Sequence, residues 1–249
     1  MDWDGTTSLV RAGWAEIMAT LYVEQISPRP DDDPAALHRR AWDEVMRLNG
    51  KPSIHQAQRL VELVAEHGGP ARDAAFFHNE FQKRLGDSRT QRLSPLRAQS
   101  DPTDALLVPG VRKFFETLRT HGLRLTLATG TALSQALEEA KLLGVAHFFE
   151  GRIYGPTDAK DTAFSKGAVI QALLQEQEIE GAELLAFGDG PVEIAETVAV
   201  GGFAVAVACD ENHPGRLDEW KRDLLLAAGA QAVIADYTEA PELLAKLGV

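Results

Sequence analysis

The chain has 249 residues, 45% of them hydrophobic, a length that suits one large domain or two smaller ones with a substantial core. The 25 basic and 37 acidic residues give a formal net charge of -12, which disfavours nucleic acid and anionic membrane as partners. The sequence contains no run of about 18 apolar residues, so it predicts no membrane-spanning helix. We also expect no secretory signal and place the protein in the cytoplasm.

The first ten residues carry two carboxylates two positions apart, Asp2 and Asp4, followed by Gly5 and a run of hydroxyl side chains. At the end of an extended segment this spacing places one acidic side chain and one backbone carbonyl on the same side. Such a pair suits a cation and a phosphoryl group, whereas the alternative is an acidic surface turn ahead of a helix. Gly5 permits a sharp turn, and residues 6–8 can cap the helix that follows.

Residues 10–85 have the apolar spacing of helices and no convincing strand. Asp33 and Pro34 are typical of a helix start, and Ser53 with Gln56 forms a capping-box pattern ahead of another helix. The polar stretch 87–104 contains two prolines and no clear periodicity, so it predicts a solvated connection between domains.

After residue 106 helices and strands alternate. Helices are predicted at 109–118, 132–143, 164–174 and 220–226, and strands at 123–128, 184–187, 203–208 and 233–235. Alternation of this kind predicts a parallel sheet covered on both faces, with ligands at the carboxyl ends of the strands. Cys209 ends one apolar run and is predicted to be a small core residue rather than a nucleophile.

Polar residues recur where these strands end, at Asp2 and Asp4, at Thr129 and at Asp189, and Lys166 lies near a helix start. In these segments the chain resembles the haloacid dehalogenase-like hydrolase superfamily, on its phosphatase branch. Residues 2–6 match its first motif, 127–130 the second, Lys166 the third and 187–193 the fourth. Lys160 is the competing candidate for the third motif, but Lys166 opens an amphipathic helix.

The resemblance implies an α/β fold with a Rossmann-like parallel sheet core at residues 1–13 and 106–249. Residues 14–105 would form an inserted all-helical cap of the C1 type, including its linker. In this family the first motif normally ends a buried strand, yet only Met1 precedes Asp2. Such a strand would bury four or five more apolar side chains, each of which stabilises a fold by about 1.5 to 3 kcal/mol. The sum is comparable to the free energy of unfolding of a whole domain, about 5 to 15 kcal/mol. We therefore expect the natural chain to start upstream, and the chain as written to have a gap in its sheet.

The resemblance also implies roles for the motif residues. Asp2 would attack phosphorus and form an aspartyl-phosphate, and Asp4 would protonate the leaving alkoxide and then take a proton from water. Mg²⁺ would bind the Asp2 carboxylate, the Asp4 carbonyl and Asp189, with Glu193 acting near the metal through water. Phosphate oxygens would be held by Thr129 and Lys166 and by the amides of Gly130 and Thr131.

An acid at position 4 favours an oxygen leaving group over a halide, because a halide needs no proton. The leading hypothesis is therefore a Mg²⁺-dependent phosphatase for a small organic phosphate monoester, similar to phosphoglycolate phosphatase. Candidate specificity residues are Arg11, Trp14, Asn49 and Lys51. A phosphotransferase or mutase acting on a sugar phosphate and a non-catalytic binding protein are the alternatives, and we expect a monomer or homodimer.

Overall fold

The computed structural model describes residues 1–26, 32–49, 51–98, 103–157 and 163–248. Its helices are α1 (Trp14–Gln25), α2 (Pro34–Met46), α3 (Ile54–Glu66), α4 (Ala74–Ala98), α5 (Val111–Thr120), α6 (Leu133–Leu142), α7 (Lys166–Gln177), α8 (Pro191–Ala199), α9 (Glu219–Ala227) and α10 (Ala240–Leu247). The strands are β1 (Leu127–Ala128), β2 (Ile153–Tyr154), β3 (Leu185–Gly188), β4 (Phe203–Val207) and β5 (Ala232–Ile234), and 3-10 turns occur at Ala146–Phe148 and Gly181–Glu183. In these residues no helix combines the length and apolar character that crossing a bilayer requires.

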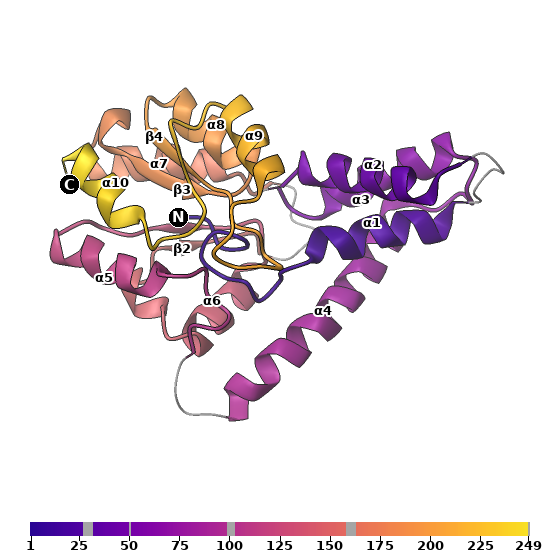
Figure 1. Cartoon of the computed structure of the whole chain (residues 1–249), viewed down its shortest axis with the longest axis horizontal. Coiled ribbons are helices and arrows are strands. Elements are labelled where there is room, and N and C mark those ends of the chain that lie inside the picture. Colours follow the sequence, from indigo (N-terminus) through magenta and orange to yellow (C-terminus); the bar gives the residue numbers. More distant parts are fainter. Residues whose placement is uncertain (27–31, 50, 99–102, 158–162, 249) are drawn as a thin grey trace.

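Helices α1 to α4 form a helical cap beside the α/β core (Figure 1). Their buried side chains, among them Met18, Val45, Leu60 and Phe77, make a hydrophobic cluster separate from that of the core. The start of α2 follows the predicted rule, because the Asp33 side chain accepts a hydrogen bond from the Ala35 amide. The cap is therefore a folded unit with its own apolar interior.

The predicted capping box at the start of α3 does not form. Ser53 has helical backbone angles, and its hydroxyl accepts a hydrogen bond from Gln82 at 2.9 Å. Gln56 donates from Nε2 to the Leu48 carbonyl, also at 2.9 Å. Both side chains therefore connect different elements of the cap, because tertiary partners replace the local ones that the pattern predicts.

Helix α4 continues to Ala98, so the prediction of a solvated connection was wrong for residues 87–98. Leu93 and Leu96 are buried in the hydrophobic cluster of the core. Arg92 donates to backbone carbonyls within residues 9–12. These contacts stabilise a helix whose polar composition alone does not favour it, since most helical stability in proteins comes from packing. Figure 1 shows α4 running from the cap back along the core towards α6.

The core contains parallel strands, as predicted, arranged as β1-β2 and β3-β4-β5. Strand β1 is shorter than the predicted 123–128, and β2 was not predicted. Alternate residues of β4 point to opposite faces: Val205 and Val207 pack in the cluster that holds α5 and α10, whereas Ala204 and Ala206 pack with α8 and α9. Helices therefore cover both faces of this sheet.

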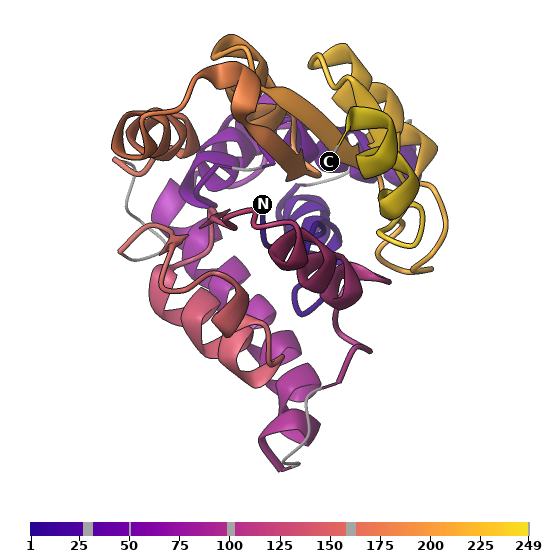
Figure 2. The same ribbon diagram turned by 90° about the vertical axis from the view of Figure 1, so that its left-hand side faces the viewer.

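Residues 1 and 2 lie between the two groups of strands (Figure 2). The Asp2 amide donates to the Phe187 carbonyl of β3 at 3.0 Å, and the Ala128 amide of β1 donates to the Met1 carbonyl at the same distance. A cavity of about 310 Å³ also separates the two groups and is lined by residues of β1, β3 and α7. Residues 1 and 2 therefore connect the two groups of strands through backbone hydrogen bonds, and Asp2 lies at the edge where both groups meet.

The packing of α4 predicts a measurable cost for shortening Leu93, which is fully buried. Leu93→Ala should lower the free energy of unfolding by about 2 to 5 kcal/mol, because it removes apolar contacts and leaves a cavity. Gln91→Ala, at an exposed position of the same helix, should change it by less than about 0.5 kcal/mol. Urea denaturation measures both, and equal effects would contradict the packing of α4 on the core.

Candidate active site

The loop that carries Asp2 and Asp4 is closed by backbone hydrogen bonds. The amides of Thr7 and Ser8 both donate to the Trp3 carbonyl at 2.8 Å. Gly5 has a φ of 71°, and a Cβ on it would lie 2.2 Å from Asp189 Oδ2. Only glycine fits this left-handed, crowded position, and it allows the loop to lie directly against the end of β3.

A cavity of about 80 Å³ lies between this loop and the cap. Every residue predicted to be catalytic or substrate-binding lines it, namely Asp2, Asp4, Arg11, Trp14, Asn49, Lys51, Thr129, Gly130, Thr131 and Lys166. The cap contributes further polar groups that sequence reasoning missed, namely Ser53, Gln56 and Gln82. Widely separated segments of the chain therefore converge on one small cavity.

Asp2 and Lys166 form a buried ion pair at the base of the cavity. Lys166 Nζ lies 2.7 Å from Asp2 Oδ1 and 3.2 Å from Glu193 Oε2. Burial raises the pKa of Asp2 to about 6, although the ammonium of Lys166 acts in the opposite direction. Burial alone would lower the pKa of Lys166, but the carboxylates of Asp2 and Glu193 raise it. The cation therefore stays charged beside the carboxylate.

Asp189 is held by several donors at the end of β3. Lys221 Nζ lies 2.9 Å from Asp189 Oδ2 and 2.8 Å from Glu211 Oε1. Asn49 of the cap donates from Nδ2 to Asp189 Oδ2 at 3.3 Å. Burial raises the pKa of Asp189 to about 6, opposed chiefly by Lys221. Sequence reasoning missed Lys221 and Glu211, because no motif marks them and only the fold brings them to Asp189.

Asp2, Asp189 and Glu193 could together hold a metal ion. One oxygen from each lies within 4.8 Å of the others, and all three side chains are buried. Hard oxygen donors of this kind fit Mg²⁺ better than softer metals. Glu193 Oε1 also accepts the Gly190 amide at 2.7 Å, which ties this carboxylate to the start of α8. The side chain of Asp4 lies outside this group of three.

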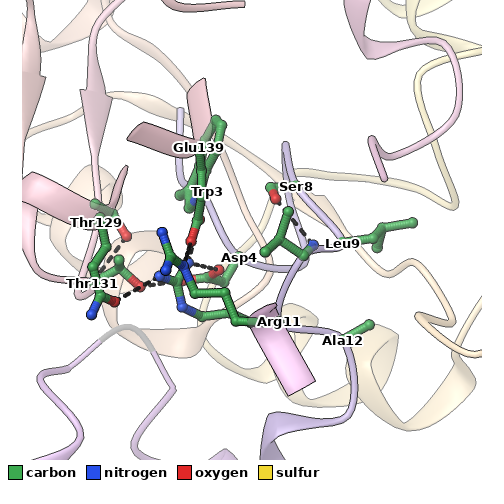
Figure 3. A network of polar contacts seen from close by, with 12 residues as sticks. Trp3, Asp4, Ser8, Leu9, Arg11, Ala12, Thr129, Thr131 and Glu139 are labelled. Carbon is green, nitrogen blue, oxygen red and sulfur yellow. Dashed lines mark hydrogen bonds and ion pairs between the residues drawn. The ribbon is translucent and has the colours of Figure 1, made fainter. Parts of the chain in front are cut away.

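Asp4 faces the cavity with both carboxylate oxygens bonded (Figure 3). Arg11 Nη1 lies 3.2 Å from Oδ1, and the Thr131 hydroxyl donates to Oδ2 at 2.6 Å. Burial raises the pKa of Asp4, while the positive charge of Arg11 lowers it. A carboxyl group that retains its proton more readily is suited to act as an acid.

The remaining predicted residues have clear positions. Thr129 directly follows β1, and its hydroxyl accepts the Thr131 amide at 3.0 Å. Cys209 is fully buried in the core, and burial raises the pKa of its thiol to about 11, as suits a core residue. Trp3, between the two aspartates of the first motif, is fully buried, and its indole donates to Glu139 at 2.9 Å. Lys160 lies outside the described residues.

A sequence model of the haloacid dehalogenase-like hydrolase family matches residues 1–201. The chain belongs to this family. The match includes every motif residue named above, from Asp2 to Glu193. The fold, with its Rossmann-like core and helical cap, agrees with that membership.

Three proteins similar to this chain share 16 to 26% sequence identity with it. A phosphorylated carbohydrates phosphatase from Thermotoga maritima is 26% identical over 128 residues, which are 49% of this chain and 56% of the relative. A solved haloacid dehalogenase-like protein of unknown function from Agrobacterium tumefaciens has a TM-score of 0.67 at 16% identity, covering 100% of this chain and 97% of the other. A predicted phosphoglycolate phosphatase from Haemophilus somnus has a TM-score of 0.61 at 16% identity, covering 97% and 95%. At these identities the two structures show the shared fold.

We expect removal of the buried Lys221 cation to destabilise the fold. Lys221→Met should lower the free energy of unfolding in metal-free buffer by about 3 to 5 kcal/mol, because Asp189 and Glu211 would remain buried without it. Arg222→Met, which removes a partly exposed cation from the same helix, should leave the denaturation curve close to that of the wild type. Denaturant titration of both variants checks this, and a Lys221→Met curve that overlays that of Arg222→Met would refute it.

Proposed function

We propose that this hydrolase is a Mg²⁺-dependent phosphatase that acts on a small organic phosphate monoester. The observation that carries the proposal is the convergence of Asp2, Asp4, Thr129 and Lys166 on one cavity. The two carboxylates have different partners, because Asp2 pairs with the Lys166 ammonium and Asp4 with the Arg11 guanidinium. We assign them different roles. A nucleophile and a proton donor that face the same cavity suit phosphoryl transfer.

In this proposal Asp2 is the nucleophile. Its carboxylate oxygen attacks phosphorus while the bond between phosphorus and the ester oxygen breaks, which gives an aspartyl-phosphate. Asp4 gives its proton to the departing ester oxygen and then takes one from the water that attacks the aspartyl-phosphate. Inorganic phosphate leaves, and both carboxyl groups return to their starting state. The raised pKa of Asp4 supports the first of its two tasks.

The phosphate oxygens need positive or hydrogen-bonding partners during this transfer. Lys166 supplies a buried ammonium next to Asp2, and Thr129 supplies a hydroxyl at the end of β1. Gly130 and Thr131 line the same cavity just ahead of α6, where backbone amides attract anions. Lys166 would shift part of its interaction from Asp2 to the phosphate, because both are anionic.

Asp2, Asp189 and Glu193 would hold Mg²⁺ beside this position, with Glu193 contributing through water. When bound, the ion would offset the negative charge of the carboxylates and the phosphate. Lys166 and Lys221 already offset part of the negative charge of these carboxylates. Asn49 of the cap donates a hydrogen bond to Asp189.

The substrate is proposed to carry hydroxyl groups and to be small, because the cavity is about 80 Å³. Lys51, Ser53 and Gln82 supply charged and polar groups on the cap side. In the described part of the chain, the buried Oε1 of Gln56 has no hydrogen-bond partner, so a substrate hydroxyl could donate to it. The name of the Thermotoga relative, which refers to phosphorylated carbohydrates, supports the same class. Arg11 is better explained as a partner of Asp4 than as a substrate ligand.

The proposal predicts metal-dependent release of inorganic phosphate from a panel of small phosphate esters, including phosphoglycolate, glycerol phosphates and hexose phosphates. Chelation of divalent cations should abolish turnover, and added Mg²⁺ should restore it, because the carboxylate cluster then regains its counter-charge. Mg²⁺ should also raise the melting temperature of the wild type, since a ligand that binds the native state stabilises it. Asp236→Asn, at a buried aspartate outside the cavity, serves as the control and should turn over normally.

Phosphate transfer to an added sugar in place of water would identify a phosphotransferase instead. Ligand binding without any turnover would favour the non-catalytic alternative. Absence of metal-dependent turnover across the panel would overturn the proposed function.

A further inference from the structure

A single nitrogen atom of Arg11 contacts two carboxylates from distant parts of the chain. Its Nη1 lies 3.2 Å from Asp4 Oδ1 and 2.5 Å from Glu139 Oε2 (Figure 3). Its Nη2 donates to Gln135 Oε1 at 2.9 Å, and the whole residue is only 4% exposed. The guanidinium is thus fixed between the motif loop and helix α6, and its weaker contact is the one to Asp4.

Glu139 is fully buried on α6 and accepts hydrogen bonds from three directions. The Trp3 indole donates to Oε2 at 2.9 Å, and Arg11 donates to the same oxygen. Arg89, on the cap helix α4, pairs with Oε1. A buried carboxylate needs such partners, and here one of the two cations comes from the cap.

These contacts form a chain of alternating charge: Arg89, Glu139, Arg11 and Asp4. Asp4 and Glu139 compete for the same Nη1 of Arg11. Because Arg89 neutralises part of the charge on Glu139, it leaves more of Arg11 available to Asp4. If Arg89 were removed, Glu139 would attract Arg11 more strongly, and the contact to Asp4 would lengthen.

We propose that Arg11 is a positioning residue that orients Asp4 for proton transfer, and that Arg89 of the cap supports this position through Glu139. The proposal rests on the proposed function, in which Asp4 gives a proton to the leaving oxygen as its bond to phosphorus breaks. It goes beyond that function by linking the cap helix α4 to the acid of the core. Neither Glu139 nor Arg89 lines the cavity, so both act only through other residues.

The test compares two arginines of α4 that both pair with glutamates. Arg89→Met breaks the chain to Asp4, whereas Arg84→Met breaks a pair with Glu24 on the surface of the cap. For each variant kcat/KM is measured with an alkyl phosphate, whose leaving group needs a proton, and with 4-nitrophenyl phosphate, whose leaving group departs as the anion. Since kcat/KM reports the first irreversible step, it isolates the step in which Asp4 acts as the acid.

Arg89→Met should lower kcat/KM for the alkyl ester on the order of tenfold and for the aryl ester by less than about twofold, because only the first needs an oriented acid. Arg84→Met should leave both values unchanged. Arg11→Met should give a larger loss in the same sense, on the order of 10²-fold for the alkyl ester. If Arg11→Met fails to fold, Arg11→Met combined with Glu139→Gln removes both charges and keeps an acceptor for Trp3, and it should show the same selective loss.

Equal losses for the two esters in Arg89→Met, or no loss for either, would overturn the positioning role. Both esters are chosen from those that the wild type hydrolyses, so that absence of metal-dependent turnover with every ester tried would instead overturn the proposed function, and the positioning role with it. The two failures are therefore distinguishable in one set of measurements.

Discussion

Burial of several carboxylates in one small region is the constraint on which the rest of this structure depends. Carboxylate oxygens of Asp2, Asp189 and Glu193 lie within 4.8 Å of one another, and Asp4 and Glu139 are close to each other through Arg11. Uncompensated, such charges would strongly destabilise the fold. Lys166, Lys221, Arg11 and Arg89 offset them, each from a different helix or loop. The core and the cap are arranged so that these cations reach the carboxylates.

The cap takes part in this arrangement directly. Asn49 bonds Asp189, and Arg89 pairs with Glu139. Trp42 of α2 packs against Trp220 of α9, with ring centroids 4.5 Å apart. Helix α4 spans both units, since its first half packs within the cap and Leu93 packs with the core. Contacts between the cap and the core therefore include partners of the buried carboxylates, which is why we link the position of the cap to the chemistry.

The sequence was sufficient to predict the parallel core and the convergence of the motif residues at one cavity. Thr129 and Asp189 directly follow or end buried strands, so their meeting follows from the topology of a parallel sheet. Lys221, Glu139 and Arg89 could not be found in this way. Each lies on a helix with no motif around it, and its partner is distant in sequence. The extent of α4 was missed for a similar reason, because its second half is stabilised by contacts with residues 9–12 and not by its own composition.

The proposed reaction depends on transfer of the phosphoryl group to Asp2. The most direct measurement is to mix the protein with substrate and Mg²⁺, quench within one turnover, and reduce with borohydride, which converts an aspartyl-phosphate to homoserine. Peptide mass spectrometry should then find homoserine at position 2 and intact aspartate at positions 4 and 189. Homoserine at another position, or unmodified Asp2 during active turnover, would contradict the account.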